Sequence, residues 1–125
     1  MFGLLQNIEI YNIRRIIIVK KQETGRRGKM IKIIVRNKIR QGRKAEFLVL
    51  VKELVEESRK EEGNITYGLW QDRSDPDILT FVEDWKDQAA IDAHNATEHF
   101  KRIVPLMIKL ADAEQREARH YVQVF

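Results

Sequence analysis

Residues 31–39, IKIIVRNKI, alternate between two kinds of side chain, and this stretch decides the fold. Every second position holds an apolar residue or an asparagine, and the positions between them hold mainly basic residues. A period of two is typical of a β-strand with one buried face. We therefore predict a strand that buries Ile31, Ile33, Val35, Asn37 and Ile39 and ends at the turn residues 41–43.

The spacing of the apolar residues changes after this turn. Between about residues 44 and 61, apolar residues recur at positions i, i+3, i+4, i+7 and i+8, which is the spacing of one face of an α-helix. These residues are Phe47, Leu50, Val51, Leu54 and Val55. We predict an amphipathic helix, and we expect Gly63 to end it in the left-handed conformation that glycine adopts readily.

A β-hairpin is predicted next. Residues 64–71 and 78–85 read as strands, and residues 72–77, DRSDPD, have the composition of a turn. The two strands should pair with each other across that turn.

Two further helices and a strand complete the chain. Asp87 is a suitable N-cap for a short helix, and Thr97 can cap a second one. We expect Pro105 to bend or restart the second helix, because proline lacks the amide N–H. A last strand is predicted over residues 120–125.

The predicted order is strand, helix, strand, strand, helix, strand, which is the ferredoxin-like α+β arrangement βαββαβ with a four-stranded antiparallel sheet. Two helices cover only one face of such a sheet, yet the strands carry apolar residues on both faces. In the strand 78–85, one face carries Leu79, Phe81 and Trp85, and the other carries Ile78, Thr80 and Val82. In the strand 64–71, one face carries Ile65, Tyr67 and Leu69, and the other carries Trp70. We therefore predict a homodimer whose sheets pack face to face as a dimeric α/β barrel.

The basic charge of the chain is confined to its beginning. The net charge is +4, but residues 1–29 hold seven Lys or Arg against two Asp or Glu, and residues 30–125 hold 16 against 17. Because residues 30–125 are almost neutral, they give no electrostatic basis for binding nucleic acid. The chain has no cysteine and no apolar stretch of membrane-spanning length. We expect a cytoplasmic protein without a nucleic-acid or membrane partner.

Met30 is the predicted start of the domain. Residues 25–29, GRRGK, are basic and glycine-containing, so we expect residues 1–29 to be an extension and residues 30–125 to be the domain. Purine-rich codons for these residues would suit a ribosome-binding site just before Met30. We therefore hypothesise that translation starts at Met30 and that residues 1–29 result from a start codon placed too far upstream. The alternative is a genuine basic arm with an added strand over residues 8–19.

Asn37 and Trp85 are candidates for ligand contact. A buried carboxamide costs about 1–3 kcal/mol unless it is hydrogen-bonded. Asn37 therefore either satisfies an irregular backbone or presents its donor and acceptor to a ligand. Trp85 either packs in the core or lines a pocket, and its indole N–H favours a position at the edge of the core.

His94 and His99 are candidate general bases, because an imidazole titrates near neutral pH, although either could instead form a structural hydrogen bond. On one continuous helix they would lie about 140° apart, which does not suit a single metal ion. His120 is the only other histidine of the chain. A metal site of two histidines and a carboxylate therefore has little support, and we predict no metal ligands. The sequence also lacks a glycine-rich phosphate loop and a nucleophile motif, so we predict no cofactor.

From Met30 to Phe125 the chain resembles the antibiotic biosynthesis monooxygenase family, whose quinol monooxygenase-like members are dimeric ferredoxin-like proteins. The matching parts are the strand 31–39 with Gly42-Arg43 after it, and Glu62-Gly63-Asn64 leading to Tyr67. The most specific block is Phe81-Val82-Glu83-Asp84-Trp85 followed by Ala93-His94 and His99-Phe100.

This resemblance implies a cofactor-independent monooxygenase that oxidises a quinol or a related polycyclic phenol with molecular oxygen, in a pocket between sheet and helices. Asn37 and Trp85 would orient the aromatic substrate, and His94 or His99 would take the phenolic proton. The pocket wall would consist of Tyr67, Phe81 and Phe100.

Other branches of the family imply other functions. One branch degrades haem with an Asn, a Trp and a His, but here the helix positions expected to hold the Trp and the His are His94 and Val104, which argues against that reaction. Some relatives isomerise a phosphorylated signalling sugar, and many have no assigned activity. Such an isomerase, or a non-catalytic dimeric module that binds a small apolar molecule, is the alternative function.

Overall fold

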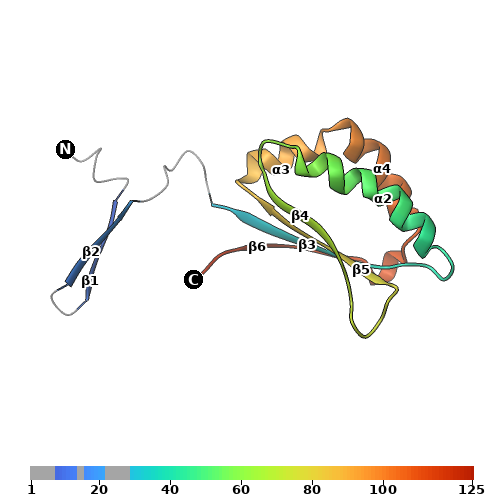
Figure 1. The fold of residues 1–125 in the computed structure, drawn as a ribbon, viewed down its shortest axis with the longest axis horizontal. Helices are drawn as coiled ribbons and strands as arrows, with labels where there is room; N and C mark the ends of the chain where they lie inside the picture. Colours follow the sequence, from blue (N-terminus) through green and yellow to red (C-terminus); the bar gives the residue numbers. More distant parts are fainter. Residues whose placement is uncertain (1–7, 14–15, 22–28) are drawn as a thin grey trace.

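The computed structural model describes residues 8–13, 16–21 and 29–125 (Figure 1). Strands β1 (Ile8–Ile13) and β2 (Ile16–Lys21) pair antiparallel as a two-stranded sheet of their own. The alternative of one added strand over residues 8–19 is thus replaced by two strands that pair with each other. The hypothesis that residues 1–29 result from a start codon placed too far upstream stays a prediction. Much of that segment lies outside the described residues.

The remaining elements form the ferredoxin-like α+β fold that the sequence predicts. The four-stranded antiparallel sheet has the order β4-β5-β3-β6 and is open at both edges. In chain order the elements are β3 (Ile31–Lys38), α2 (Lys44–Arg59), β4 (Asn64–Gln71), β5 (Ile78–Trp85), α3 (Gln88–Asn95), α4 (Glu98–Lys109), the 3-10 helix η1 (Ala113–Gln115) and β6 (Glu117–Val122). Among the described residues, no helix has the length and apolar character that a bilayer crossing requires.

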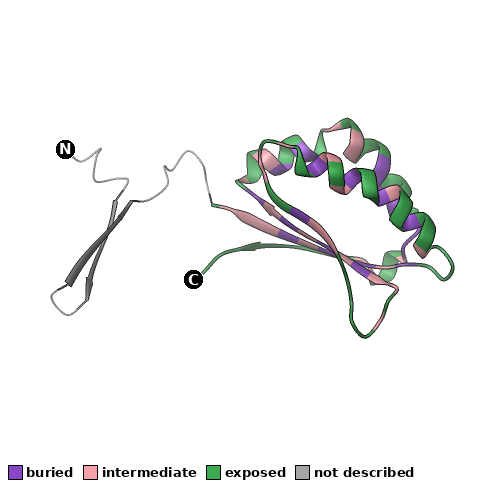
Figure 2. Cartoon of the chain, in the orientation of Figure 1, coloured by how far each residue is buried: buried purple, intermediate pink, exposed green. Residues whose placement is uncertain are grey.

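The helices α2, α3 and α4 lie on one side of the sheet, and the buried residues lie between the two layers (Figures 1 and 2). The period-two prediction holds: alternate residues of β3 and β5 are buried. They are Ile33, Val35 and Asn37 in β3 and Leu79, Phe81, Glu83 and Trp85 in β5. The buried face of β5 therefore contains a carboxylic acid.

Within residues 29–125, no element covers the opposite face of the sheet (Figure 1). It carries Ile34 and Val82 from the two central strands, which pair with each other. Trp70 and Tyr121 lie on the same face and are 65% and 46% exposed. The face-to-face homodimer stays a prediction that this surface suits.

Both predicted helix starts are confirmed. The Asp87 carboxylate accepts a 2.9 Å hydrogen bond from the backbone N–H of Ala90, and the Thr97 hydroxyl accepts one of 3.2 Å from Phe100. Thr97 also donates to the His94 carbonyl at 2.7 Å, so one hydroxyl ties the end of α3 to the start of α4. Of the expected bend or restart at Pro105, the restart is wrong, since α4 runs through this residue. Pro105 lies on the exposed side of the helix, where water can satisfy the carbonyl that proline leaves unbonded.

Gly63 has a different role from the predicted one. It does not take the left-handed conformation, whereas Gly42 does, with φ 78°. A Cβ on Gly63 would stand 2.3 Å from the Cβ of Ala90, so this position accommodates the close approach of α3. The helix before it ends slightly earlier than predicted, at Arg59.

Two strand details also differ from the predictions. The register of β4 shifts between Asn64 and Thr66, and this bulge leaves Ile65 50% exposed instead of on the buried side with Tyr67. The last strand spans residues 117–122 and not 120–125. Its ladder follows β3 and ends where Val122 meets Ile31.

Candidate active site

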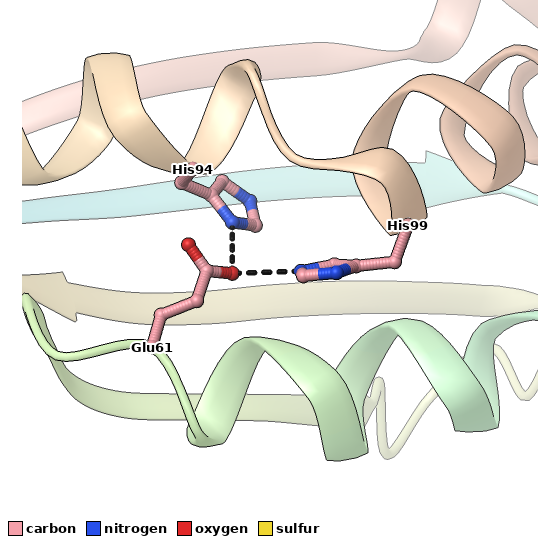
Figure 3. Close-up of side chains that lie close together, drawn as sticks. All are labelled: Glu61, His94 and His99. Atoms are coloured by element: carbon pink, nitrogen blue, oxygen red, sulfur yellow. Dashed lines mark hydrogen bonds and ion pairs between the residues drawn. The ribbon is translucent and has the colours of Figure 1, made fainter.

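Three side chains from separate segments meet at one carboxylate oxygen (Figure 3). Glu61 lies in the turn after α2, His94 in the last turn of α3 and His99 in the first turn of α4. Oε2 of Glu61 lies 2.8 Å from Nδ1 of His94 and 2.8 Å from Nε2 of His99. The 140° separation that one continuous helix would give does not apply, because α3 ends at Asn95 and α4 begins after the predicted N-cap Thr97.

With Glu61 as a carboxylate and both rings neutral, this geometry assigns the proton of each ring to one nitrogen. A carboxylate oxygen only accepts hydrogen bonds, so each neutral imidazole directs its N–H toward Glu61. His94 is then the Nδ1–H tautomer and His99 the Nε2–H tautomer. The other nitrogen of each ring, Nε2 of His94 and Nδ1 of His99, is left as a proton acceptor. Glu61 orients both rings as the carboxylate of a catalytic triad orients its histidine.

The two imidazoles differ in accessibility. The side chain of His94 is 3% exposed and that of His99 is 14% exposed, the same value as for Glu61. Burial lowers the pKa of His94 below its ordinary value, and the hydrogen bond with Glu61 opposes this only in part. His94 is therefore held as a neutral ring inside the protein, and His99 is the imidazole that a ligand reaches more easily.

Aromatic rings surround His94. Its ring centroid lies 4.4 Å from that of Trp85, 5.0 Å from that of Phe100 and 5.6 Å from that of Tyr67. Tyr67 in turn packs against Phe81 at 5.8 Å. Trp85 and Phe81 are 0% and 1% exposed, so they form a packed wall behind His94. Burial raises the pKa of the Tyr67 phenol, which keeps it protonated.

Asn37 does not belong to this group. It pairs with Leu79, which lies at the other end of β5 from Trp85. Leu79 and Trp85 are six positions apart along the strand, a distance of about 20 Å. The amide nitrogen of Asn37 donates to the carbonyls of Val35 and Leu79, both at 3.4 Å. Its Oδ1 is fully buried and has no hydrogen-bond partner among the described residues. The structure thus brings together six of the seven predicted site residues and leaves Asn37 apart.

Glu83 is a candidate that the sequence prediction missed. It is 5% exposed, and its carboxylate accepts a 2.9 Å hydrogen bond from the indole N–H of Trp85. Burial raises the pKa of Glu83 to about 7, although hydrogen bonds from Trp85 and Tyr67 oppose that shift. The alternation of the predicted strand already places position 83 on the buried face. Glu61, by contrast, falls at the end of a predicted helix and carries no sequence signal of its own.

A surface cavity of about 420 Å³ opens beside Glu61. Its lining includes Ala90 and Ala93 from α3 and Thr97 from the break between the helices. Besides Glu61, the charged residues of its lining are Glu62, Lys86 and Asp87. Glu61 is therefore the one member of the three-residue site that lines this cavity, and neither histidine does.

Comparisons with known proteins agree on one family. The model of the antibiotic biosynthesis monooxygenase family matches residues 30–106, a range that includes Glu61, His94 and His99. A curated protein of Bacillus subtilis (strain 168), "Putative monooxygenase YcnE", is 39% identical over 67 residues, which are 54% of this chain and 70% of that protein.

Solved structures show the same similarity. A conserved protein from Methanosarcina mazei Go1 is 38% identical, with a TM-score of 0.73 over 76% of this chain and 93% of that one. A crystal structure of an antibiotic biosynthesis monooxygenase is 35% identical, with a TM-score of 0.66 over 76% of this chain and 97% of that one.

Proposed function

The chain belongs to the antibiotic biosynthesis monooxygenase family, and from this premise we propose that it is a cofactor-independent monooxygenase that oxidises a quinol or a related polycyclic phenol with molecular oxygen. The observation that carries the proposal is the Glu61 oxygen that both imidazoles share. It leaves a proton acceptor on His99, whose ring centroid lies 6.2 Å from that of His94, the imidazole that the aromatic rings surround. A weakly acidic aromatic substrate requires that combination of a base and apolar walls.

The substrate itself supplies the electrons for this reaction. Loss of the phenolic proton gives an electron-rich anion that can donate to oxygen. For a quinol, one oxygen atom enters the ring as a hydroxyl group, the ring is oxidised to the quinone, and the second oxygen atom leaves as water. This four-electron oxidation of the quinol balances the four-electron reduction of oxygen, so no external reductant is needed. The protein has to deprotonate, orient and desolvate the substrate.

We assign these tasks to separate residues. His99 takes the phenolic proton on Nδ1, because its Nε2 is bound to Glu61 and its side chain is the more accessible of the two imidazoles. Glu61 positions His99 and stabilises the imidazolium that forms. Phe100 and Tyr67 supply the aromatic wall, and Trp85 supports the ring of His94 from behind.

We also propose the homodimer. The uncovered face of the sheet carries Ile34 and Val82 at its centre, with Trp70 exposed beside them. A second copy that packs its sheet on this face would remove these apolar groups from water.

Oxygen uptake tests the function. The chelator-treated protein is supplied with a panel of reduced quinones and anthrones, and heat-denatured protein measures autoxidation. We expect turnover above the control rate that added chelator does not lower. No rate above autoxidation on any substrate would contradict the proposal and favour the binding module or the sugar-phosphate isomerase.

A further inference from the structure

We propose that Glu61, His94 and His99 also bind one divalent transition-metal ion of the Zn²⁺ class, and that the bound ion removes the proton acceptor of this site. The second half of this inference rests on the proposed function. The first half stands on the geometry of the three side chains alone.

The distances suit such an ion. The three ligand atoms all lie within 4.8 Å of one another, and Oε2 of Glu61 is 2.8 Å from each imidazole nitrogen. Around tetrahedral zinc, ligand atoms at about 2.0–2.2 Å from the metal stand about 3.3 Å apart. The carboxylate oxygen would withdraw by about half an ångström, and the imidazole nitrogens would approach each other by at most about 1.5 Å. Glu61 lies in a turn, so its withdrawal disturbs neither a helix nor a strand.

The donor set selects the kind of ion. Two imidazole nitrogens and one carboxylate suit Zn²⁺ and its neighbours in the transition series, whereas Mg²⁺ and Ca²⁺ require a shell of oxygens. The three protein ligands leave a fourth position open for a water molecule. One of the three, Glu61, lines the surface cavity of about 420 Å³.

The surroundings hold the ligands in place. The ring of His94 is fixed between Trp85 at 4.4 Å and Phe100 at 5.0 Å. Thr97 ties the backbone of His94 to the helix that carries His99. Because His94 is buried, the attraction between the ion and the Glu61 carboxylate acts in a medium of low dielectric constant.

Metal binding would reverse the hydrogen-bonding roles of the rings. The ion would occupy Nδ1 of His94 and Nε2 of His99, which are the nitrogens that donate to Glu61 in its absence. A neutral imidazole bound through one nitrogen carries its proton on the other. Nδ1 of His99 would then be a donor and could no longer take the phenolic proton.

Zinc titration of the chelator-stripped full chain tests the site directly. We expect calorimetry to show one Zn²⁺ per chain, with affinity at least tenfold weaker in Glu61→Gln, His94→Gln and His99→Gln. His120→Gln is the matched control, because His120 is the third histidine of the chain and lies exposed on β6. Its affinity should equal that of the wild type. Unchanged binding in His99→Gln, or loss of binding in His120→Gln, would overturn the site.

Imidazole nitrogen resonances of the unmodified protein give a test that no folding defect can obscure. On addition of Zn²⁺, the resonances of His94 and His99 should shift and those of His120 should not. Shifts confined to His120, or no shifts at all, would contradict the site.

The loss of the acceptor is tested by activity. Zn²⁺ should inhibit oxygen uptake over the concentration range in which it binds, and a chelator should restore the rate. Full turnover with Zn²⁺ bound would overturn this half of the inference. If no substrate gives oxygen uptake, the proposed function fails, and the titration still decides whether the metal site exists.

Discussion

The indole N–H of Trp85 donates a 2.9 Å hydrogen bond to the carboxylate of Glu83, which lies two residues earlier on the same buried face of β5. Burial raises the pKa of Glu83 to about 7 from its ordinary value of 4.5. Between these two pH values the folded protein keeps a proton that the unfolded chain releases. The stability that this group contributes is therefore complete below about pH 4.5 and is lost as the pH rises to about 7.

Replacing this group should remove that pH dependence. Relative to the wild type, Glu83→Gln should gain roughly 3 kcal/mol of unfolding free energy between pH 4.5 and 7 and then stay level. Urea denaturation at several pH values measures the difference. Glu56→Gln, on the exposed side of α2, is the control and should show no such trend. A difference between Glu83→Gln and wild type that does not change with pH would refute this role of burial.

Asn37 allows a structural and a ligand-binding role to be separated. Leucine has nearly the same shape, and Asn37→Leu removes the buried Oδ1 that has no partner among the described residues. We expect the unfolding free energy to stay within about 1 kcal/mol of the wild type, because the loss of two long hydrogen bonds offsets the removal of that oxygen. The kcat/KM should change less than threefold, since Asn37 lies far from His99. A large rise in KM with unchanged stability would place the substrate at Asn37 instead.

The uncovered sheet face should determine the oligomeric state. Val82→Lys puts a charge at the centre of that face and should convert a dimer into a monomer at the same protein concentration. Val49→Lys is the matched control, because Val49 is 80% exposed on α2, away from the sheet. Light scattering coupled to size exclusion gives the masses. A wild-type monomer, or a dimer that persists in Val82→Lys, would rule out this interface.

The assignment of the base rests on His99. His99→Gln should retain the fold and lower kcat on the order of 10²- to 10⁴-fold, the usual effect of losing a general base. His120→Gln should leave kcat unchanged. Steady-state oxygen uptake compares the two variants, with circular dichroism as a check of folding. Wild-type kcat in His99→Gln would transfer the role to another group.

Much of the fold could be predicted from local patterns. Period-two alternation defines the strand that begins at Ile31, and the polar turn at residues 72–77 separates the two strands of the hairpin. The short polar side chains of Asp87 and Thr97 mark the two helix starts. The last strand was misplaced because all its residues are exposed, so no buried face gives it a readable period. The bulge at Ile65 depends on pairing with β5, which lies outside any local pattern.

The candidate site was harder to predict because it depends on how separate segments meet. His94 and His99 were recognised, but their convergence requires the change of direction at Thr97. Glu61 joins them from a turn 33 residues before His94. Glu83 could have been identified from its buried position in the strand. Which aromatic rings are buried and which a ligand can contact depends on tertiary packing, which no local sequence pattern shows.

The central claim, that this chain inserts one atom of molecular oxygen into a phenolic substrate without a cofactor, is tested most directly by isotope labelling. The chelator-treated protein is supplied with ¹⁸O₂ and the best substrate of the panel, and the product is analysed by mass spectrometry. The account predicts one ¹⁸O atom in each product molecule and the other in water. An unlabelled quinone formed together with hydrogen peroxide, or no product above the heat-denatured control, would contradict it.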